Sequence, residues 1–108
     1  MVNRGNRQFV GFKLSHYPIF ETLAKQEPRD AGLQRDLSVS YNKVGDVQGA
    51  QGDLAGALKS YHDSLAIRQT LAKQEPRNAG LQRDLSVSYN KVGDVQSAQG
   101  YLAGALKS

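Results

Sequence analysis

The 108-residue sequence contains no cysteine. This absence excludes disulfide bonds, thiolate metal ligands and cysteine nucleophiles, so packing alone has to stabilise the fold. The sequence also lacks an uninterrupted apolar run near the roughly 18 residues that a membrane-spanning helix needs. Residues 1–17 have no apolar stretch of the kind that a signal peptide contains. We therefore expect a protein without a membrane span, located in the cytoplasm.

Most of the chain is close to neutral, because the net positive charge comes largely from its N-terminal residues. The formal net charge is +4, but Arg4, Arg7 and Lys13 precede the first acidic residue, Glu21. The rest of the chain holds 11 basic and 10 acidic residues, with both signs interspersed. Because a nucleic-acid surface concentrates basic side chains on one face, we expect no nucleic-acid binding by this body. An RNA-contacting protein would have to use the N-terminal arm, residues 1–15.

What the sequence does contain is an internal repeat. Residues 71–108 match residues 23–60 at 35 of 38 positions, with a period of 48 residues. The three differences replace Asp30 by Asn78, Gly49 by Ser97 and Asp53 by Tyr101. A fixed period of about 20–50 residues is typical of repeat proteins, in which each unit contacts only its neighbours. The modest apolar fraction of 39% also favours a thin, regular arrangement over a thick core.

Apolar residues within one period recur at steps of three or four, which is the spacing of an amphipathic helix. The stripe of the first repeat helix is Leu33, Leu37, Tyr41, Val44 and Val47 or Gln48, and that of the second is Leu54, Ala57 or Leu58, Tyr61, Leu65 and Leu71 or Ala72, interrupted by Arg68. We predict a first helix over 31–51, a second over 54–74, and a further copy of the first over 79–99. Partial copies of the second helix are expected at both chain ends, over 18–27 and 102–108.

Residues between these ranges are typical of helix ends. Gly52 can adopt the left-handed conformation that ends a helix, and Asp53 can cap the next one, so two residues suffice for a sharp reversal. Residues 75–77 contain a proline that stops the second helix, and Asn78, like Asp30 in the first copy, can cap the following helix. The sequence therefore predicts antiparallel helical hairpins.

Several small and aromatic residues recur at fixed offsets around the Gly-Asp turn. In the first copy they are Tyr41, Val44, Gly45, Gly52, Asp53, Leu54, Ala57, Tyr61 and Leu65, and the second copy carries Tyr89, Val92, Gly93, Gly100, Leu102 and Ala105. This set resembles the tetratricopeptide repeat (TPR) family, and the period of 48 rather than about 34 residues marks a long-period variant. The resemblance implies an all-α fold of hairpins stacked as an alpha-alpha superhelix, or solenoid. Gly45 and Ala57 are expected where the two helices approach most closely.

The resemblance also implies a concave, partner-binding face on the first helix of each repeat. The matching positions that we single out are Val39, Asn42, Asp46, Val87, Asn90 and Asp94. Some family members hold a peptide carboxylate with a Lys and Asn clamp. Asn42 and Asn90 match the Asn type, but Asp46 and Asp94 lie one turn further on and would repel a carboxylate. The more general expectation is a protein or peptide partner.

Residues with catalytic potential are few and do not cluster. His62 lies on a polar face with no candidate partner, and His16 falls at a non-equivalent position. Lys43 and Asp46 have the spacing of solvent-facing charges on a helix. The glycines follow no strand, so they do not form a phosphate-binding loop. We expect no enzyme, no metal site and no cofactor.

The chain ends favour self-assembly. Helical repeats bury their apolar faces by stacking, and arrays normally need about three repeats with polar terminal caps, which this chain lacks. We expect the partial helices of two chains to meet end to end, giving a dimer or a head-to-tail fibre. The residues assigned to this contact are Tyr17, Ile19, Phe20, Tyr101, Leu102 and Leu106.

The domain division that follows is a variable arm over 1–15 and a repeat domain over 16–108. The arm has no counterpart in the repeat, and its apolar residues could either cover the open end of the array or belong to a free tail. The leading hypothesis is a non-catalytic interaction or self-assembly scaffold. The alternative is a piece of a larger TPR-containing regulatory or signalling protein that presents a peptide-binding concave face.

Overall fold

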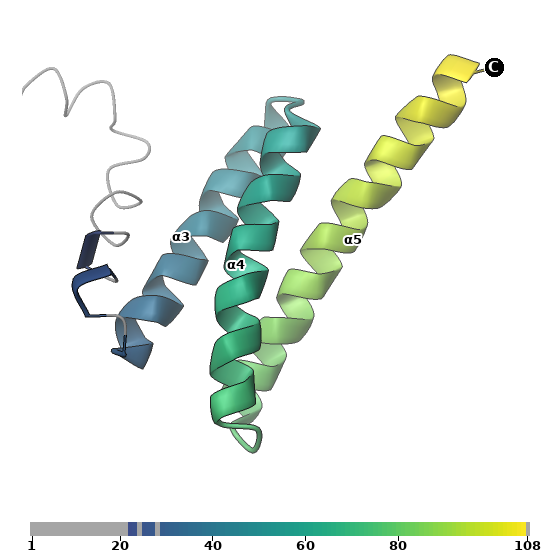
Figure 1. Cartoon of the computed structure of the whole chain (residues 1–108). Coiled ribbons are helices and arrows are strands. Elements are labelled where there is room, and N and C mark those ends of the chain that lie inside the picture. The colour runs from purple at the N-terminus through teal and green to yellow at the C-terminus, as the bar shows by residue number, and fades with distance from the viewer. Residues whose placement is uncertain (1–21, 24, 28, 108) are drawn as a thin grey trace, which may run out of the picture.

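The computed structural model describes residues 22, 23, 25–27 and 29–107. In this part of the chain there are three long helices, α3 (Ala31–Ala50), α4 (Leu54–Gln74) and α5 (Ala79–Lys107), and no strand. Helix α4 packs against both α3 and α5 (Figure 1). The prediction of an all-helical fold is confirmed, and α3 and α4 fall on the ranges 31–51 and 54–74 that the apolar spacing predicts.

The α3–α4 hairpin closes through the expected two residues. Gly52 has a φ of +88°, a left-handed conformation that a side chain would strain. The Asp53 side chain then accepts a hydrogen bond from the Gly56 backbone N–H and caps α4. At the start of α3, Asp30 accepts from the Leu33 N–H in the same way.

The connection from α4 to α5 also follows the sequence. Glu75 is the C-cap residue of α4, and Pro76 follows it. Asn78 accepts a hydrogen bond from the Leu81 N–H through its side-chain oxygen, at 3.1 Å. Asn78 and its counterpart Asp30 therefore perform the same capping role, although one is neutral and the other charged.

The predicted end of the third helix near residue 99 is wrong. Helix α5 continues to Lys107, so residues 102–107 extend it instead of starting a new helix after a turn. Tyr101 stands where the first copy has the capping Asp53, and a tyrosine has no short oxygen to accept the free N–H groups of a new helix. At the position of Gly49 in the first copy, the second copy has Ser97, and serine disfavours a helix less than glycine does. Without a cap, continuing the backbone hydrogen bonds is more favourable than breaking them.

Predictions at the N-terminus can be compared with the structure only in part. Residues 22, 23, 25 and 26, within the expected partial helix 18–27, are helical. The arm 1–15 and residues 18–21 and 24 of that partial helix lie outside the described residues, and Glu27 lies in a bend instead of the helix. The Leu23 side chain is 37% exposed.

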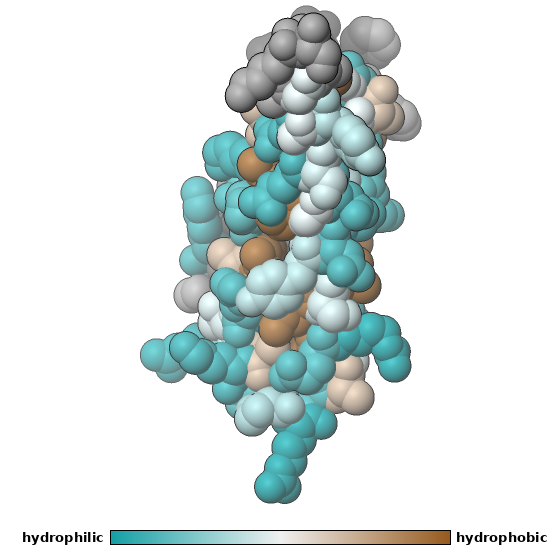
Figure 2. All heavy atoms as spheres, turned by 90° about the vertical axis from the view of Figure 1, so that its right-hand side faces the viewer, coloured by the Kyte–Doolittle hydropathy of each residue, from teal (hydrophilic) through white to brown (hydrophobic). Residues whose placement is uncertain are grey.

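The clusters of buried hydrophobic residues lie between α4 and α5. On the side where α5 lies, hydrophilic residues cover most of the surface, and hydrophobic residues appear only as a broken band among them (Figure 2). A second small cluster, Leu71, Ala72 and Leu81, joins the end of α4 to the start of α5.

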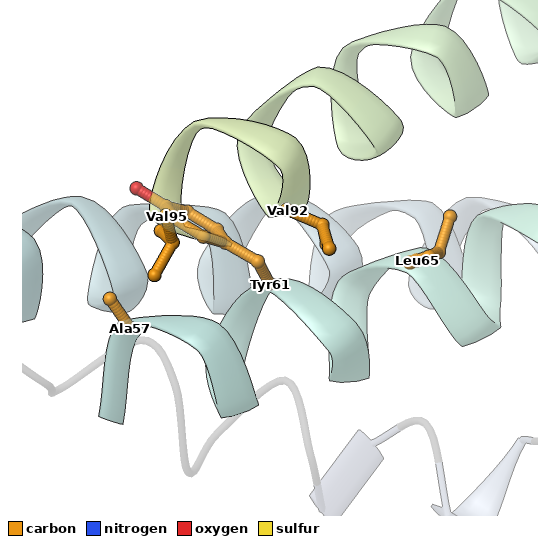
Figure 3. Packing of buried hydrophobic residues seen from close by; sticks show 5 residues of the cluster. All are labelled: Ala57, Tyr61, Leu65, Val92 and Val95. Carbon is orange, nitrogen blue, oxygen red and sulfur yellow. The ribbon is translucent and has the colours of Figure 1, made fainter. Parts of the chain in front are cut away.

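The main core cluster contains Ala57, Tyr61 and Leu65 of α4 together with Val92 and Val95 of α5. Figure 3 shows the two valines lying over the α4 side chains. Full burial of a Val or Leu side chain contributes about 1.5–3 kcal/mol. Ala57 is 0% exposed, as expected for a close approach of helices.

Candidate functional site

Helix α3 contacts α4 through one face, which we call the forward face. Its five positions are Ser38, Asn42, Gly45, Gln48 and Gly49. Gly45 is essential to this contact, because a Cβ atom there would lie 2.6 Å from the Tyr61 ring. Gln48 accepts a hydrogen bond from the Ser60 hydroxyl at 2.7 Å. The forward face therefore receives the helix that follows it in the chain.

Helix α5 contacts α4 through a different face, which we call the rear face. Its positions are Leu81, Leu85, Ser88, Val92 and Val95. The rear face therefore packs on the helix that precedes it in the chain. Since α3 and α5 are copies of one sequence, each copy carries both faces, and α4 occupies one face of each.

The forward face of α5 is open. Its members are Ser86, Asn90, Gly93, Gln96 and Ser97, and they match the α3 positions at four of the five sites. Four of these residues are exposed and Gly93 is half-buried. A Cβ atom on Gly93 would meet nothing within 4 Å. The same surface that holds α4 on α3 therefore has no helix against it on α5 among the described residues.

A buried arginine joins all three helices. Arg68 of α4 is 6% exposed. Its Nε donates to Ser38 Oγ of α3 at 3.0 Å, and its Nη1 donates to the Asp84 carbonyl and to Ser88 Oγ of α5, both at 3.1 Å. Burial lowers the pKa of the guanidinium, and the Asp84 charge opposes this effect. Arg68 is thus a structural cation, whereas the sequence presented it only as a break in an apolar stripe.

Two ion pairs connect α3 directly to α5. Arg35 Nε lies 2.8 Å from Asp84 Oδ2, and Lys91 Nζ lies 2.9 Å from Asp46 Oδ1. In each pair one residue comes from the first copy and the other from the second. The Asp84 carboxylate raises the pKa of Arg35, chiefly through the hydrogen bond. Together the pairs fix the position of one repeat along the other.

Tyr61 and Asp46 form a polar contact at the edge of the core. The Tyr61 hydroxyl donates to Asp46 Oδ1, and the Lys91 ammonium lies 5.6 Å from the centre of the Tyr61 ring. Burial raises the pKa of Tyr61, and the bond to Asp46 raises it further. Burial alone would raise the pKa of Asp46, but the bonds from Lys91 and Tyr61 outweigh burial and lower it. Asp46 is therefore an ionised acceptor shared by two helices.

The six residues predicted for a concave face do not form one equivalent surface. Val39 and Val87 are 39% and 40% exposed, and Asn90 and Asp94 are exposed too. Asn42, however, is 8% exposed and belongs to the forward face under α4. Its assignment to partner contact is wrong for this copy, because helical spacing turns position 42 toward the hairpin partner. Asp46 is exposed but already bonded within the chain.

The residues predicted for self-association can be compared at two positions. Tyr101 is 80% exposed and Leu102 is 56% exposed, both on the extension of α5. Tyr17, Ile19 and Phe20, together with the side chain of Leu106, lie outside what the structure describes. The hypothesis that partial helices of two chains meet end to end therefore stays a prediction.

The candidate catalytic and metal-binding residues can be compared with the structure only among the described residues. His62 is exposed. Within the same residues no group of three metal-ligating side chains comes together, and none of the helices is apolar enough over its length to cross a membrane. The features that sequence reasoning missed are the Arg68 contacts and the two ion pairs. Only the recurrence of the same charges in both copies could have indicated the pairs.

Comparison with known proteins assigns no family. No family model matches the chain, and neither a curated protein nor a solved structure matches it. The resemblance to the TPR family therefore rests on residues of this chain, and function has to be argued from the helix faces described above.

Proposed function

We propose that this chain is a non-catalytic helical-repeat module that binds protein helices, including those of its own copies. In this proposal the hairpins are TPR-like units that stack as a superhelix. The arrangement of the three helices supports it. Copies of one helix use a forward face and a rear face on the same α4, and these two modes of contact suffice to extend the array by another repeat.

One observation carries the proposal, namely the open forward face of α5. Four of its five residues are identical to those that hold α4 on α3. The occupied copy shows what such a surface accepts. A glycine receives an aromatic ring, and serine accepts a hydrogen bond from a buried arginine. We infer that the partner is an amphipathic helix with the chemistry of α4.

The test uses a synthetic peptide with the sequence of residues 54–74, titrated into the isotopically labelled chain. Tyr61 of the peptide should pack on Gly93, and Arg68 of the peptide should bond to Ser86. We expect NMR shift changes at the forward face of α5, where the Asn90 side-chain amide is a direct reporter. If the peptide instead displaced the chain's own α4, the NMR signals of α3 would shift.

Two controls sharpen this test. A peptide carrying Tyr61→Ala loses the ring that fills the glycine position, and the protein variant Gly93→Leu fills that position itself. Either change should weaken binding by at least about tenfold, because a contact worth over 1.4 kcal/mol is lost or blocked. Equal binding of a scrambled peptide would refute the proposal.

The alternative proposal is a larger regulatory or signalling protein that presents a concave, peptide-binding face. It is favoured by the matching exposure of Val39 and Val87, which are equivalent apolar residues on a surface that α4 does not cover. A partner of this kind would shift the signals of these two valines and leave the Asn90 amide unchanged.

A further inference from the structure

The two ion pairs between α3 and α5 have a direction. Helix α3 contributes Arg35 and Asp46 to them, and helix α5 contributes Asp84 and Lys91. Each helix therefore supplies one positive and one negative group. The pairs match only when the two helices lie in parallel and in this register.

Each helix also carries the complementary half of the same arrangement. In α5, Arg83 and Asp94 are the repeat equivalents of Arg35 and Asp46. In α3, Asp36 and Lys43 are the equivalents of Asp84 and Lys91.

These four charged residues lie on the surface. They are exposed, and none of them takes part in an ion pair among the described residues. The α5 edge thus carries the same two residue types that α3 contributes to the internal contact, and the α3 edge carries the two types that α5 contributes.

We propose that the α5 edge of one chain binds the α3 edge of a second copy, with Arg83 paired to Asp36 and Asp94 paired to Lys43. This inference rests on the proposed function, since it names the partner of a self-binding module. The contact joins unlike edges, so it is heterologous and adds chains head to tail. It differs from the end-to-end contact of partial helices because it uses the sides of α3 and α5.

Charge complementarity favours a second copy over another partner. A uniformly acidic or basic surface would attract one group of each edge and repel the other. The internal contact supplies the geometry, since Arg35–Asp84 and Lys91–Asp46 already close at 2.8 and 2.9 Å with the same residue types. Exposed ion pairs are weak singly, so the contact should set register and weaken as salt rises.

The experiment is a charge swap measured by sedimentation velocity at low ionic strength over a wide range of concentrations. The first variant reverses the α5 edge with Arg83→Glu and Asp94→Lys. The second reverses the α3 edge with Asp36→Lys and Lys43→Glu. None of these changes alters a residue of the internal ion pairs.

We expect the wild type to associate with rising concentration and each variant alone to associate at least about tenfold more weakly, because both pairs become repulsive. An equimolar mixture should associate again, since each variant's reversed edge meets a matching edge on the other. The chain with all four changes should behave like the wild type. Circular dichroism checks that each variant is helical, and the milder pair Arg83→Gln with Asp94→Asn replaces the first variant if it unfolds.

A wild type that stays monomeric, or a mixture that fails to restore association, overturns the inference. The proposed function is judged separately by titrating the 54–74 peptide into the Arg83→Glu and Asp94→Lys variant, whose forward face is intact. If this variant binds the peptide while the wild type stays monomeric, the proposed function stands and only the edge contact is removed. If the peptide does not bind and the wild type stays monomeric, the proposed function and the edge contact are both removed.

Discussion

Helices α3 and α5 have almost the same sequence over the repeat but different surroundings. Asn42 is buried and its counterpart Asn90 is exposed, and Ser38 is buried while Ser86 is exposed. Conversely, Val95 is buried and its counterpart Val47 is 43% exposed. Burial in this chain is therefore decided by which neighbour is present, and not by the identity of the residue alone. Substitutions at equivalent positions can separate these two influences.

Arg68→Ala should have the largest effect. The change leaves the Ser38 and Ser88 hydroxyls and the Asp84 carbonyl without their shared donor, and it opens a cavity between three helices. We expect a loss of about 3 kcal/mol of unfolding free energy. Urea unfolding followed by far-UV circular dichroism measures it. As matched controls, Ser38→Ala should cost more than Ser86→Ala, and equal losses would contradict the assigned role of Arg68.

The glycine pair tests the two faces directly. Gly45→Ala puts a methyl group against the Tyr61 ring, so we expect a net loss of about 1–2 kcal/mol after the gain in helix propensity. Gly93→Ala meets open space and should instead stabilise the chain by about 0.5–1 kcal/mol. Thermal unfolding of both variants at low concentration gives the comparison. A loss at Gly93 as large as at Gly45 would show that a helix already covers α5.

Exchanging the cap residues tests why one copy turns and the other does not. Tyr101→Asp restores a cap and should favour a break in α5 at Gly100, while Asp53→Tyr should cost about 1 kcal/mol at the start of α4. Backbone chemical shifts of residues 98–104 report the helical state of this segment. Unbroken helical shifts in the Tyr101→Asp variant would mean that the cap does not decide the turn.

The smallest expected effect is on acid stability. The pKa of Asp46 is lowered in the folded chain, so its contribution is complete above the unfolded value of about 3.9 and is lost as the pH falls through the folded value. Asp46→Asn should therefore reduce stability near neutral pH and flatten its decline below about pH 4. Denaturant unfolding at several pH values measures this. Asp94→Asn is the control, because Asp94 has no ion pair in the described chain, and an equal flattening would contradict the assignment.

The helices α3 and α4 could be predicted from the sequence because their determinants are local. Apolar spacing, Gly52 and the Asp53 cap all act within a few residues of each other. The end of the third helix cannot be obtained by copying the boundary of the first, because the two copies differ at the residue that would cap the next helix. We attribute the longer helix to Tyr101, which stands in place of the capping Asp53 and outweighs the identical residues around it.

The candidate surface could be predicted only in part because its contacts are long-range. Arg68 joins groups on two other helices, and its polar partners are serines that no local pattern marks. The ion pairs join residues 45 to 49 positions apart in the chain. The burial of Asn42 likewise depends on a contact with another helix, because its exposed counterpart Asn90 has the same local sequence.

The uninterrupted path of α5 through Gly100 and Tyr101 bears on how such a chain can change over generations. Every aspartate codon differs from a tyrosine codon by one nucleotide. If the cap is decisive, a single base replacement is enough to convert a folded-back hairpin into a straight rod. The topology of an array built from these units would then be inherited through a change as small as any coding mutation.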